Sequence, residues 1–511
     1  MANISIYEGK DIGLTAEGMA MLQALYSRSP ASVEVQLKKV QKNGPENFMQ
    51  QFYCGYSHKS IGDCGTISIF IEGISHIACK AIQSNTVSSY QESSTRYLDF
   101  SKQPLINPFD LSIYRNRVMV HPTLIEEVEH ILKMWVSLYS KYLPFVKEAI
   151  LNALPRKEGQ EEKIYERAAN AKAFDIMRAF LPLGSATNTS WTTNLRQAKD
   201  HLTMVLFHPQ MEVRDIAETI WKQLQKKYPS SFENLDEVLL DLKNVYLDNG
   251  GLMNNYYMDS PALCNINPHS TTESVLNIDH PKRFQMSQEK AGYLRYNLRT
   301  FDMVGMYEAL AHLEAFWLLE ERPKNIEVPK WFAKFGTIGI DYVLDFGSFR
   351  DIQRHRAGSC PIPLINFKDV TIHPWYLGQL KLLLETVHTD SGFNSVYHEF
   401  ENDLNCQFEK LIELTEHTPI QNGLRWLLGS QYLMPLGAMC LCTGSYSLSA
   451  MSYWAELRSS STVHPTLRPI AINTCEFLAQ TFNTFTIYPD LREEELVYHR
   501  GKQTIEEKQV A

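Results

Sequence analysis

Two halves of this chain carry the same short sequence landmarks in the same order, and this repetition constrains the fold more than any other feature. Gly65–Ile71 opens with Gly-Thr-Ile and alternates polar and apolar residues as a half-buried strand does, and apolar residues at helical spacing then continue to Ile82. Gly336–Ile340 opens with the same three residues and leads into a similar stretch that ends at Ile352. An ordered repeat of this kind predicts two copies of one structural module.

Further landmarks extend the repeat. Leu-Pro-Leu-Gly at Leu181–Gly184 recurs as Met-Pro-Leu-Gly at Met434–Gly437, and His208-Pro209 recurs as His464-Pro465. We therefore predict one copy at residues 1–235, a connector rich in turn-forming residues at 236–289, and a second copy at 290–511. Strands alternate with amphipathic helical stretches such as 124–152 and 230–247, which predicts a mixed α and β fold.

Composition excludes several classes of function. A chain of 511 residues is too long for one hydrophobic core, and its net charge of −9 argues against sequence-independent binding of nucleic acid. Nine scattered cysteines suit reduced thiols, and Cys440-x-Cys442 lacks the second ligand pair of a zinc site, so no metal site is predicted. Neither a signal segment nor a run of 18 apolar residues is visible, so we expect a cytoplasmic protein without a membrane span.

Two polar segments carry the candidate chemistry. Ser89–Tyr97 reads Ser-Tyr-Gln-Glu-Ser-Ser-Thr-Arg-Tyr, and Arg354–Arg356 reads Arg-His-Arg. Taken alone, the first would be a polar loop and the second a solvated basic turn. An isolated Arg458 would be a helix-end charge, and an isolated histidine such as His464 would be a structural residue.

Together, however, the two segments resemble the signature of the flavin-dependent thymidylate synthases. In that family an Arg-His-Arg triplet runs directly into Ser-x-Asn-Glu-x-Ser-x-Arg-Tyr, whereas here the first copy has kept the run and the second copy the triplet. The resemblance implies two copies that each hold an antiparallel sheet flanked by long helices and that together form a pseudo-dimer in an α+β protein.

The first copy matches the family on the phosphate side of the nucleotide site and at the flavin. The residues that the resemblance assigns to dUMP are Glu92, Ser94, Arg96 and Arg178. Those that it assigns to the flavin are His58, Ser60, Glu92, Asn194, Arg196 and Asp200. The equivalent positions in the second copy lack this chemistry and read Ile362, Leu364, Asn366, Gln431, Ser447 and Ser449.

The second copy matches the family in its remaining elements. The resemblance assigns Arg354, His355 and Arg356 to the flavin, Asp351 and Arg354 to dUMP, and Arg458 to the uracil ring as the catalytic arginine. The first copy has Ser84-Asn85-Thr86 in place of the triplet and Val205 in place of Arg458. Losses sorted in this way predict one composite site per chain, because the family builds its site between subunits.

The resemblance also implies the reaction and the partners. Methylenetetrahydrofolate would supply a one-carbon unit, NADPH the electrons and reduced FAD a hydride, converting dUMP to dTMP. Two chains would pair as a homodimer that mimics the family's tetramer. The residues themselves suit an anionic nucleotide, since guanidinium groups bind phosphate oxygens in pairs, and no cysteine lies in a nucleophile motif.

Three departures from the family pattern leave other interpretations open. Asp351 stands where the family has a glutamine, Gln91 where it has an asparagine, and Asp200 where it has another asparagine. A carboxylate beside an anionic ligand would weaken its binding or change the ligand that is preferred. The alternatives are therefore a catalytically impaired protein that binds flavin or nucleotide, and the same flavin chemistry on another pyrimidine nucleotide.

Overall fold

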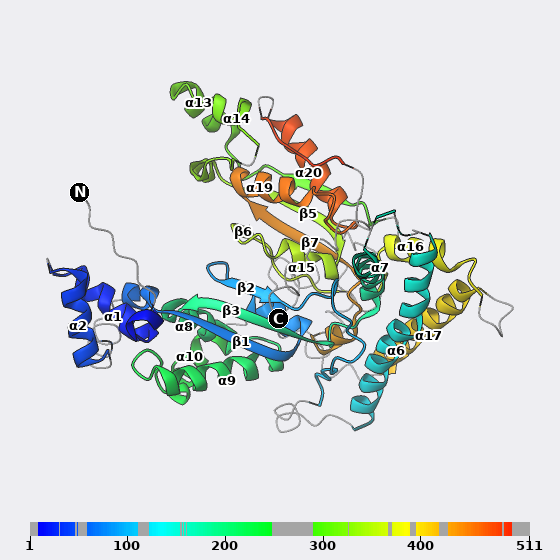
Figure 1. The fold of residues 1–511 in the computed structure, drawn as a ribbon, viewed down its shortest axis with the longest axis horizontal. Helices are drawn as coiled ribbons and strands as arrows, with labels where there is room; N and C mark the ends of the chain where they lie inside the picture. Colours follow the sequence, from blue (N-terminus) through cyan, green and yellow to red (C-terminus); the bar gives the residue numbers. More distant parts are fainter. Residues whose placement is uncertain are drawn as a thin grey trace. The chain divides into compact units, whose positions relative to one another are not determined.

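The computed structural model describes residues 9–29, 31–45, 49, 59–110, 122–153, 156, 158–159, 161–247, 290–324, 326–365, 370–388, 395–417, 428–482 and 485–492. His58, Asn366 and most of the predicted connector lie outside these residues. The described part of the chain combines helices with small antiparallel sheets, so the predicted α+β class is confirmed (Figure 1).

The chain forms two compact units that each draw on separate stretches of sequence. The first unit takes residues from 1–74, 78–92 and 187–256, and the second unit takes residues from 75–77, 93–186 and 257–511. The units therefore do not coincide with the predicted copies, because 93–186 belongs to the first copy in sequence and to the second unit in space. The copy boundaries remain a prediction from the sequence.

The first unit has a three-stranded sheet in the order β1-β3-β2. Its strands are β1 (Thr66–Ser75), β2 (Ser89–Glu92) and β3 (Ala186–Asn194), and its helices are η1 (Gly9–Ile12), α1 (Ala16–Tyr26), α2 (Val33–Asn43), η3 (Lys59–Cys64), α4 (His76–Ile82), α8 (Leu195–Val205), α9 (Met211–Lys227) and α10 (Leu235–Leu247). Along β1, Ile67 and Ile71 are buried while Phe70 is exposed, which confirms the strand that the alternating sequence predicts.

The second unit has a four-stranded sheet in the order β4-β5-β7-β6, with every neighbouring pair antiparallel. Its strands are β4 (Leu294–Asn297), β5 (Ile338–Asp345), β6 (Gly358–Ser359) and β7 (Met439–Tyr446). Its helices are α6 (Pro122–Ala153), α7 (Glu162–Met177), η4 (Arg178–Phe180), α13 (Met303–His312), α14 (Trp317–Glu320), η6 (Lys330–Phe335), α15 (Phe346–Ile352), α16 (Pro374–Leu384), α17 (Val396–His417), η8 (Gln431–Leu433), α19 (Leu448–Arg458) and α20 (Arg468–Thr481).

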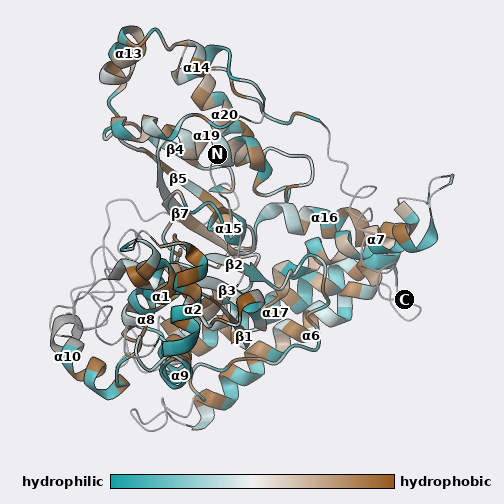
Figure 2. Cartoon of the chain, turned by 60° about the vertical axis from the view of Figure 1, so that its left-hand side comes forward, coloured by the Kyte–Doolittle hydropathy of each residue, from teal (hydrophilic) through white to brown (hydrophobic). Residues whose placement is uncertain are grey.

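Long amphipathic helices pack together in the second unit. The helix expected at 124–152 is α6, which packs against α7 and α17 (Figure 1). Its buried residues recur every three or four positions, as at Val128, Ile131, Leu132 and Trp135, and hydrophilic residues alternate with them in Figure 2. None of the described helices combines the length and apolarity that crossing a membrane requires.

The order of elements in the first half of the sequence recurs in the second half. The series β1, α4, β2, η4, β3, α8, α9 is matched by β5, α15, β6, η8, β7, α19, α20, and β1-β3-β2 has the same neighbours as β5-β7-β6. The landmark prolines also pair with each other, since Pro182 and Pro435 form an antiparallel bridge inside the second unit. A local two-fold relation would place equivalent segments side by side in this way, and the duplication stays a prediction from the sequence.

Candidate functional site

The candidate site is built on α15, which follows β5 directly in the second unit. Asp345 ends the strand and caps the helix, because its Oδ2 accepts a hydrogen bond of 2.9 Å from the backbone N–H of Ser348. A Cβ at Gly347 would lie 3.1 Å from Asp345 Oδ2 and 3.3 Å from the Leu436 carbonyl oxygen, so glycine permits the close packing of this turn. The carboxylate of Asp345 is fully buried at this turn, where it can compensate a positive charge.

Arg178 supplies this charge and is 2% exposed. One Nη donates to Ser348 Oγ at 2.8 Å and to the Tyr376 hydroxyl at 3.4 Å, and it lies 3.8 Å from Asp345 Oδ2. Burial alone would lower the pKa of Arg178, but Tyr376 and nearby carboxylates raise it above its ordinary value. This predicted phosphate ligand is thus already surrounded by hydrogen-bond acceptors of the protein.

Arg96 lies in the same unit and has a carboxylate partner of its own. Its Nε and Nη2 donate to the two oxygens of Asp175 at 2.6 and 3.2 Å, a bidentate pair that fixes the plane of the guanidinium. The same Nη2 lies 3.5 Å from the carbonyl oxygen of Thr462, in the loop that follows Arg458. Arg96, from the first predicted copy, therefore contacts a loop of the second.

Asp351 lies among arginines from both predicted copies. Its Oδ1 is 3.6 Å from Arg354 Nη1 and 3.9 Å from Arg458 Nη1. Burial would raise the pKa of the Asp351 carboxyl, but surrounding positive charges hold that pKa below its ordinary value. In order of effect, the residues responsible are Arg458, Arg354, Arg96 and Arg178. We call these four residues the arginine cluster.

Arg458, at the C-terminus of α19, is held in a defined orientation. Its Nε donates to His355 Nε2 at 2.8 Å, and its Nη2 donates to the backbone oxygen of Asp351, also at 2.8 Å. Burial and the Arg458 charge lower the pKa of His355 to about 3. The imidazole is therefore neutral near pH 7 and carries its proton on Nδ1, which leaves Nε2 free to accept. The middle residue of the triplet thus orients the predicted catalytic arginine.

The other arginines of this region differ in exposure. The Arg354 side chain is 54% exposed and is the most accessible of the arginine cluster. Arg350, one helical turn earlier, is 6% exposed and donates to Thr95 Oγ1 and to the Ser93 carbonyl oxygen. Ser94, between these two acceptors in sequence, is half-buried and accepts from the backbone N–H of Arg96.

Glu92 belongs to the first unit, where a buried lysine pairs with it. Lys80 Nζ lies 2.7 Å from Glu92 Oε2 and 2.6 Å from Gln83 Oε1, and the side chains of Lys80 and Glu92 are 0% and 3% exposed. Gln83 also donates to Thr189 Oγ1 at 3.0 Å. The same Nε2 of Gln83 lies 3.5 Å from Glu92 Oε2, so Lys80 and Gln83 together compensate for the hydration that this buried carboxyl has lost.

The residues predicted at the flavin fit such a cofactor unequally. In the first unit Asn194 caps α8 by accepting from the Gln197 N–H, and Arg196 Nε lies 2.6 Å from Asp63 Oδ1. Ser60 and Asp200 are exposed. In the second unit Arg354 presents a largely exposed guanidinium, which fits an anionic pyrophosphate, whereas His355 is occupied by Arg458.

The positions that lost their chemistry in the second copy are buried and apolar, or bonded within the protein. Ile362 and Leu364 are buried. The Gln431 side chain exchanges hydrogen bonds of 2.8 and 2.9 Å with the backbone of Ile365. A phosphate placed against these described residues would lose its hydration and gain no positive charge.

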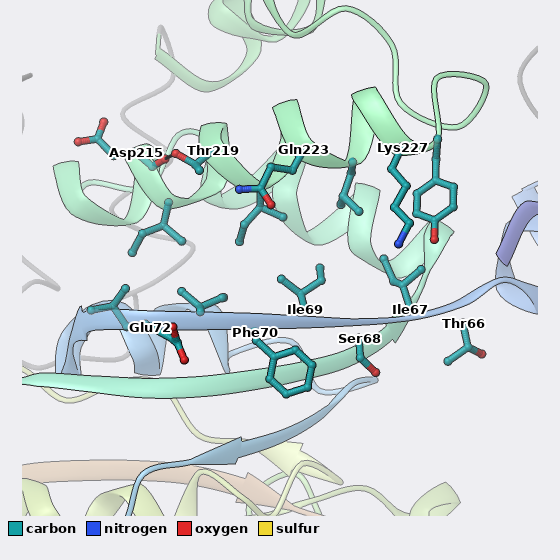
Figure 3. Close-up of a pocket in the computed structure, with 16 residues that line it drawn as sticks. Thr66, Ile67, Ser68, Ile69, Phe70, Glu72, Asp215, Thr219, Gln223 and Lys227 are labelled. Atoms are coloured by element: carbon teal, nitrogen blue, oxygen red, sulfur yellow. Dashed lines mark hydrogen bonds between the residues drawn. The ribbon is translucent and has the colours of Figure 1, made fainter. Parts of the chain in front are cut away.

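A cavity of about 880 Å³ in the first unit lies apart from these residues in sequence (Figure 3). It separates β1 from α9, with Ile67 and Ile69 on the strand and Gln223 and Lys227 on the helix (Figure 3). None of the site residues predicted from the sequence lines it.

The first half of the chain matches the model of a known protein family. Residues 16–230 match the model of the thymidylate synthase complementing protein family. The match covers less than half of the chain and lies wholly in its first half. The matched range falls within the first predicted copy and includes Glu92, Arg96 and Arg178, so the resemblance drawn from the signature segments is confirmed.

The curated proteins that this chain resembles fall into two groups by the share of the chain that they cover. A UPF0159 protein of Thermoplasma acidophilum is 22% identical over 458 residues, 84% of this chain and 85% of the relative. A UPF0159 protein of Chlamydia muridarum is 20% identical over 459 residues, 88% of this chain and 82% of the relative. A flavin-dependent thymidylate synthase of Thermococcus kodakarensis is 27% identical over 173 residues, only 34% of this chain and 58% of the relative. The first group is large, as a duplicated form would be.

Several residues of the site escape prediction from the sequence. Asp175 precedes Arg178 by one helical turn and Arg350 precedes Arg354 by one turn, and this spacing of charges was a usable signal. Asp345 and Tyr376 offered no such signal, because only the fold brings the end of β5 against α16.

Proposed function

We propose that this chain is a flavin-dependent thymidylate synthase-like enzyme that methylates dUMP to dTMP at one composite site. The observation that carries the proposal is the arginine cluster around Asp351, whose members come from both predicted copies. Arg96 and Arg178 belong to the phosphate half of the family pattern, and Arg354 and Arg458 to the ring and flavin half. The family-model match over residues 16–230 and the resemblance to flavin-dependent thymidylate synthases support the same reaction class.

Each arginine has a role suited to its surroundings. Arg354, the most exposed, would contact the phosphate first, with Arg96 presenting the edge of its guanidinium that Asp175 leaves open. Arg178 is enclosed by Ser348 and Tyr376 and would act on the nucleotide through its charge. Arg458, oriented by His355, would stabilise the negative charge that develops on the uracil ring.

FAD is the proposed cofactor, with NADPH and methylenetetrahydrofolate as co-substrates. When bound, the flavin supplies the hydride that completes the methyl group. Arg354 and Arg356 would bind its anionic part, with Asn194 and Arg196 as further proposed contacts. We also propose that two chains associate as a homodimer, because two tandem copies in one chain would take the place of a family dimer.

Asp351 supports a second candidate, a protein that binds flavin or nucleotide with impaired catalysis or with another pyrimidine preference. The carboxylate is ionised and lies within 4 Å of Arg354 and Arg458, so it already offsets part of the charge that a phosphate would use. Binding of FAD without turnover of dUMP would favour this candidate.

The proposal is tested on the purified full chain. A yellow protein that oxidises NADPH only when dUMP is present, and a gene that rescues a thymidine-requiring strain, are the expected results. Calorimetric titration should give about one dUMP per chain, and Arg96→Ala or Arg354→Ala should each abolish that binding. Two equivalent dUMP sites per chain, or binding that survives both substitutions, would contradict a composite site.

A further inference from the structure

We propose that Arg350 is a positioning residue that clamps the Ser93–Arg96 loop against α15. Arg350 Nη1 donates to Thr95 Oγ1 at 3.2 Å, and Nη2 donates to the carbonyl oxygen of Ser93 at 3.3 Å. Thr95 and Ser93 are 255 and 257 residues away from Arg350 in sequence, so the clamp joins the signature run of the first predicted copy to α15 of the second, just before the triplet.

Burial makes this clamp strong. Arg350 is 6% exposed and Thr95 is 2% exposed, so the guanidinium has exchanged water for protein partners that include these two oxygens. A buried guanidinium that lost them would lose part of the compensation for its charge, which is unfavourable. The loop therefore stays against α15 as long as Arg350 is present.

The position of the clamp links it to the site. Ser94 lies between the two clamped residues, and Arg96 follows Thr95 directly. On the other side of the contact, Arg350 is adjacent in sequence to Asp351 and one helical turn before Arg354. The clamp thus sets the spacing between the phosphate half and the ring half of the arginine cluster.

The first copy shows what becomes of this helix position without a clamp. Lys80, in α4, stands at the position equivalent to Arg350 and pairs with Glu92 instead. Ile365, equivalent to Thr95, is bonded through its backbone to Gln431. Of the two equivalent helix positions, Arg350 therefore contacts the Ser93–Arg96 loop, whereas Lys80 contacts Glu92 in β2, the strand before that loop.

This role rests on the proposed function, because it assumes that the Ser93–Arg96 loop binds dUMP. The experiment compares Arg350→Lys, Thr95→Val and Thr95→Ser with Arg299→Ala, which removes an exposed arginine of the same unit. Hydrogen exchange of the Tyr97 and Leu98 amides, which donate to the Ser94 carbonyl oxygen, reports on the loop without any ligand. Calorimetry with dUMP and steady-state kinetics report on the site.

Arg350→Lys and Thr95→Val should speed this exchange, weaken dUMP binding by roughly tenfold and raise KM with little change in kcat. Thr95→Ser, which keeps the hydroxyl, should restore both readouts, and Arg299→Ala should change neither. Unchanged exchange in Arg350→Lys and Thr95→Val would overturn the clamp, and faster exchange with unaltered dUMP affinity would overturn its role at the site. Failure of the unmodified protein to bind dUMP would overturn the proposed function, while the exchange data would still decide whether the clamp exists.

Discussion

Helices α4 and α15 each follow the first strand of their series, yet a lysine of α4 pairs with Glu92 of β2, whereas α15 has the arginine cluster beside it. The equivalent positions in the two segments are Lys80 and Arg350, Ala81 and Asp351, and Ser84 and Arg354. At α4 the Lys80 charge is paired with Glu92 inside the first unit. At α15 the carboxylate of Asp351 is outnumbered by arginines, so positive charge is left over for a ligand.

This difference shows that buried charged side chains occur where the fold supplies partners of opposite charge. A buried charge is tolerated only when partners compensate for lost hydration. Arg178 has Asp345 and Tyr376, and Arg96 has Asp175, so both persist. Where the partners are gone, as around Ile362 and Leu364, apolar side chains occupy the equivalent positions.

The largest effect is expected from removing Lys80, the buried cation of α4. Lys80→Met leaves Glu92 buried without its cation, which should reduce the free energy of unfolding by about 3–5 kcal/mol. Replacing both residues, as in Lys80→Met with Glu92→Leu, should recover most of this loss. Urea unfolding of the single and double variants measures both effects. A single variant as stable as the unmodified chain would show that the pair does not stabilise the first unit.

The next largest effect is expected at Arg458. Arg458→Ala should reduce transition-state stabilisation by about 3 kcal/mol or more, which is measured as a lower kcat/KM. Flavin should stay bound, because the proposed contact of Arg458 is with the uracil ring. Val205→Ala, at the equivalent position after α8, is the control and should have little effect on turnover by the folded protein. Steady-state kinetics and the flavin absorbance spectrum measure the two quantities. Normal turnover in Arg458→Ala would remove its catalytic assignment.

The pH dependence of stability tests the environment of His355 beside the arginine cluster. The pKa of His355 is lowered to about 3 in the fold, so the unfolded chain binds a proton at this residue below about pH 6.5 while the folded chain does not. His355 therefore does not reduce the free energy of unfolding above about pH 6.5. As the pH falls from there toward 3, that free energy decreases by up to about 1.4 kcal/mol per pH unit.

His355→Gln keeps an acceptor for Arg458 and should flatten this part of the dependence in urea unfolding between pH 4 and 7. His388→Gln, at an exposed position, is the control. An unaltered difference between pH 4 and 7 in His355→Gln would contradict a buried neutral imidazole.

The smallest effect concerns the loop after Arg458, which has no counterpart of equal length after Val205. Asp490 Oδ2 accepts from the Ser461 N–H at 3.2 Å, and the Asp490 N–H donates to Ser459 Oγ at 2.7 Å. Asp490→Asn weakens the first contact and should reduce kcat/KM by about threefold to tenfold without loss of flavin. Steady-state kinetics measure this effect. Asp236→Asn, at the exposed start of α10, is the control, and equal kinetics in the two variants would show that the contact of Asp490 with Ser461 does not affect turnover.

Part of the site could be read from the sequence because its signals are local. The strand at Gly65–Ile71 and the helix at 124–152 followed from hydrophobic periodicity, and both are present in the structure. The family and most of the arginines followed from short motifs whose residues are neighbours in the chain. Ser84 and Val205, which lack the charges of their counterparts, could be assigned in the same way by aligning the two halves.

Only the tertiary structure decided how those residues are used. It paired Arg96 with Asp175, Arg178 with Asp345 and Tyr376, and Arg458 with His355, and these contacts join residues that are 79 to 198 positions apart. It also placed 93–186 with the second half of the chain, which no periodicity could indicate. The physical reason is that pattern and propensity act over a few turns of chain. Desolvation and charge pairing depend instead on which distant segments the fold buries together.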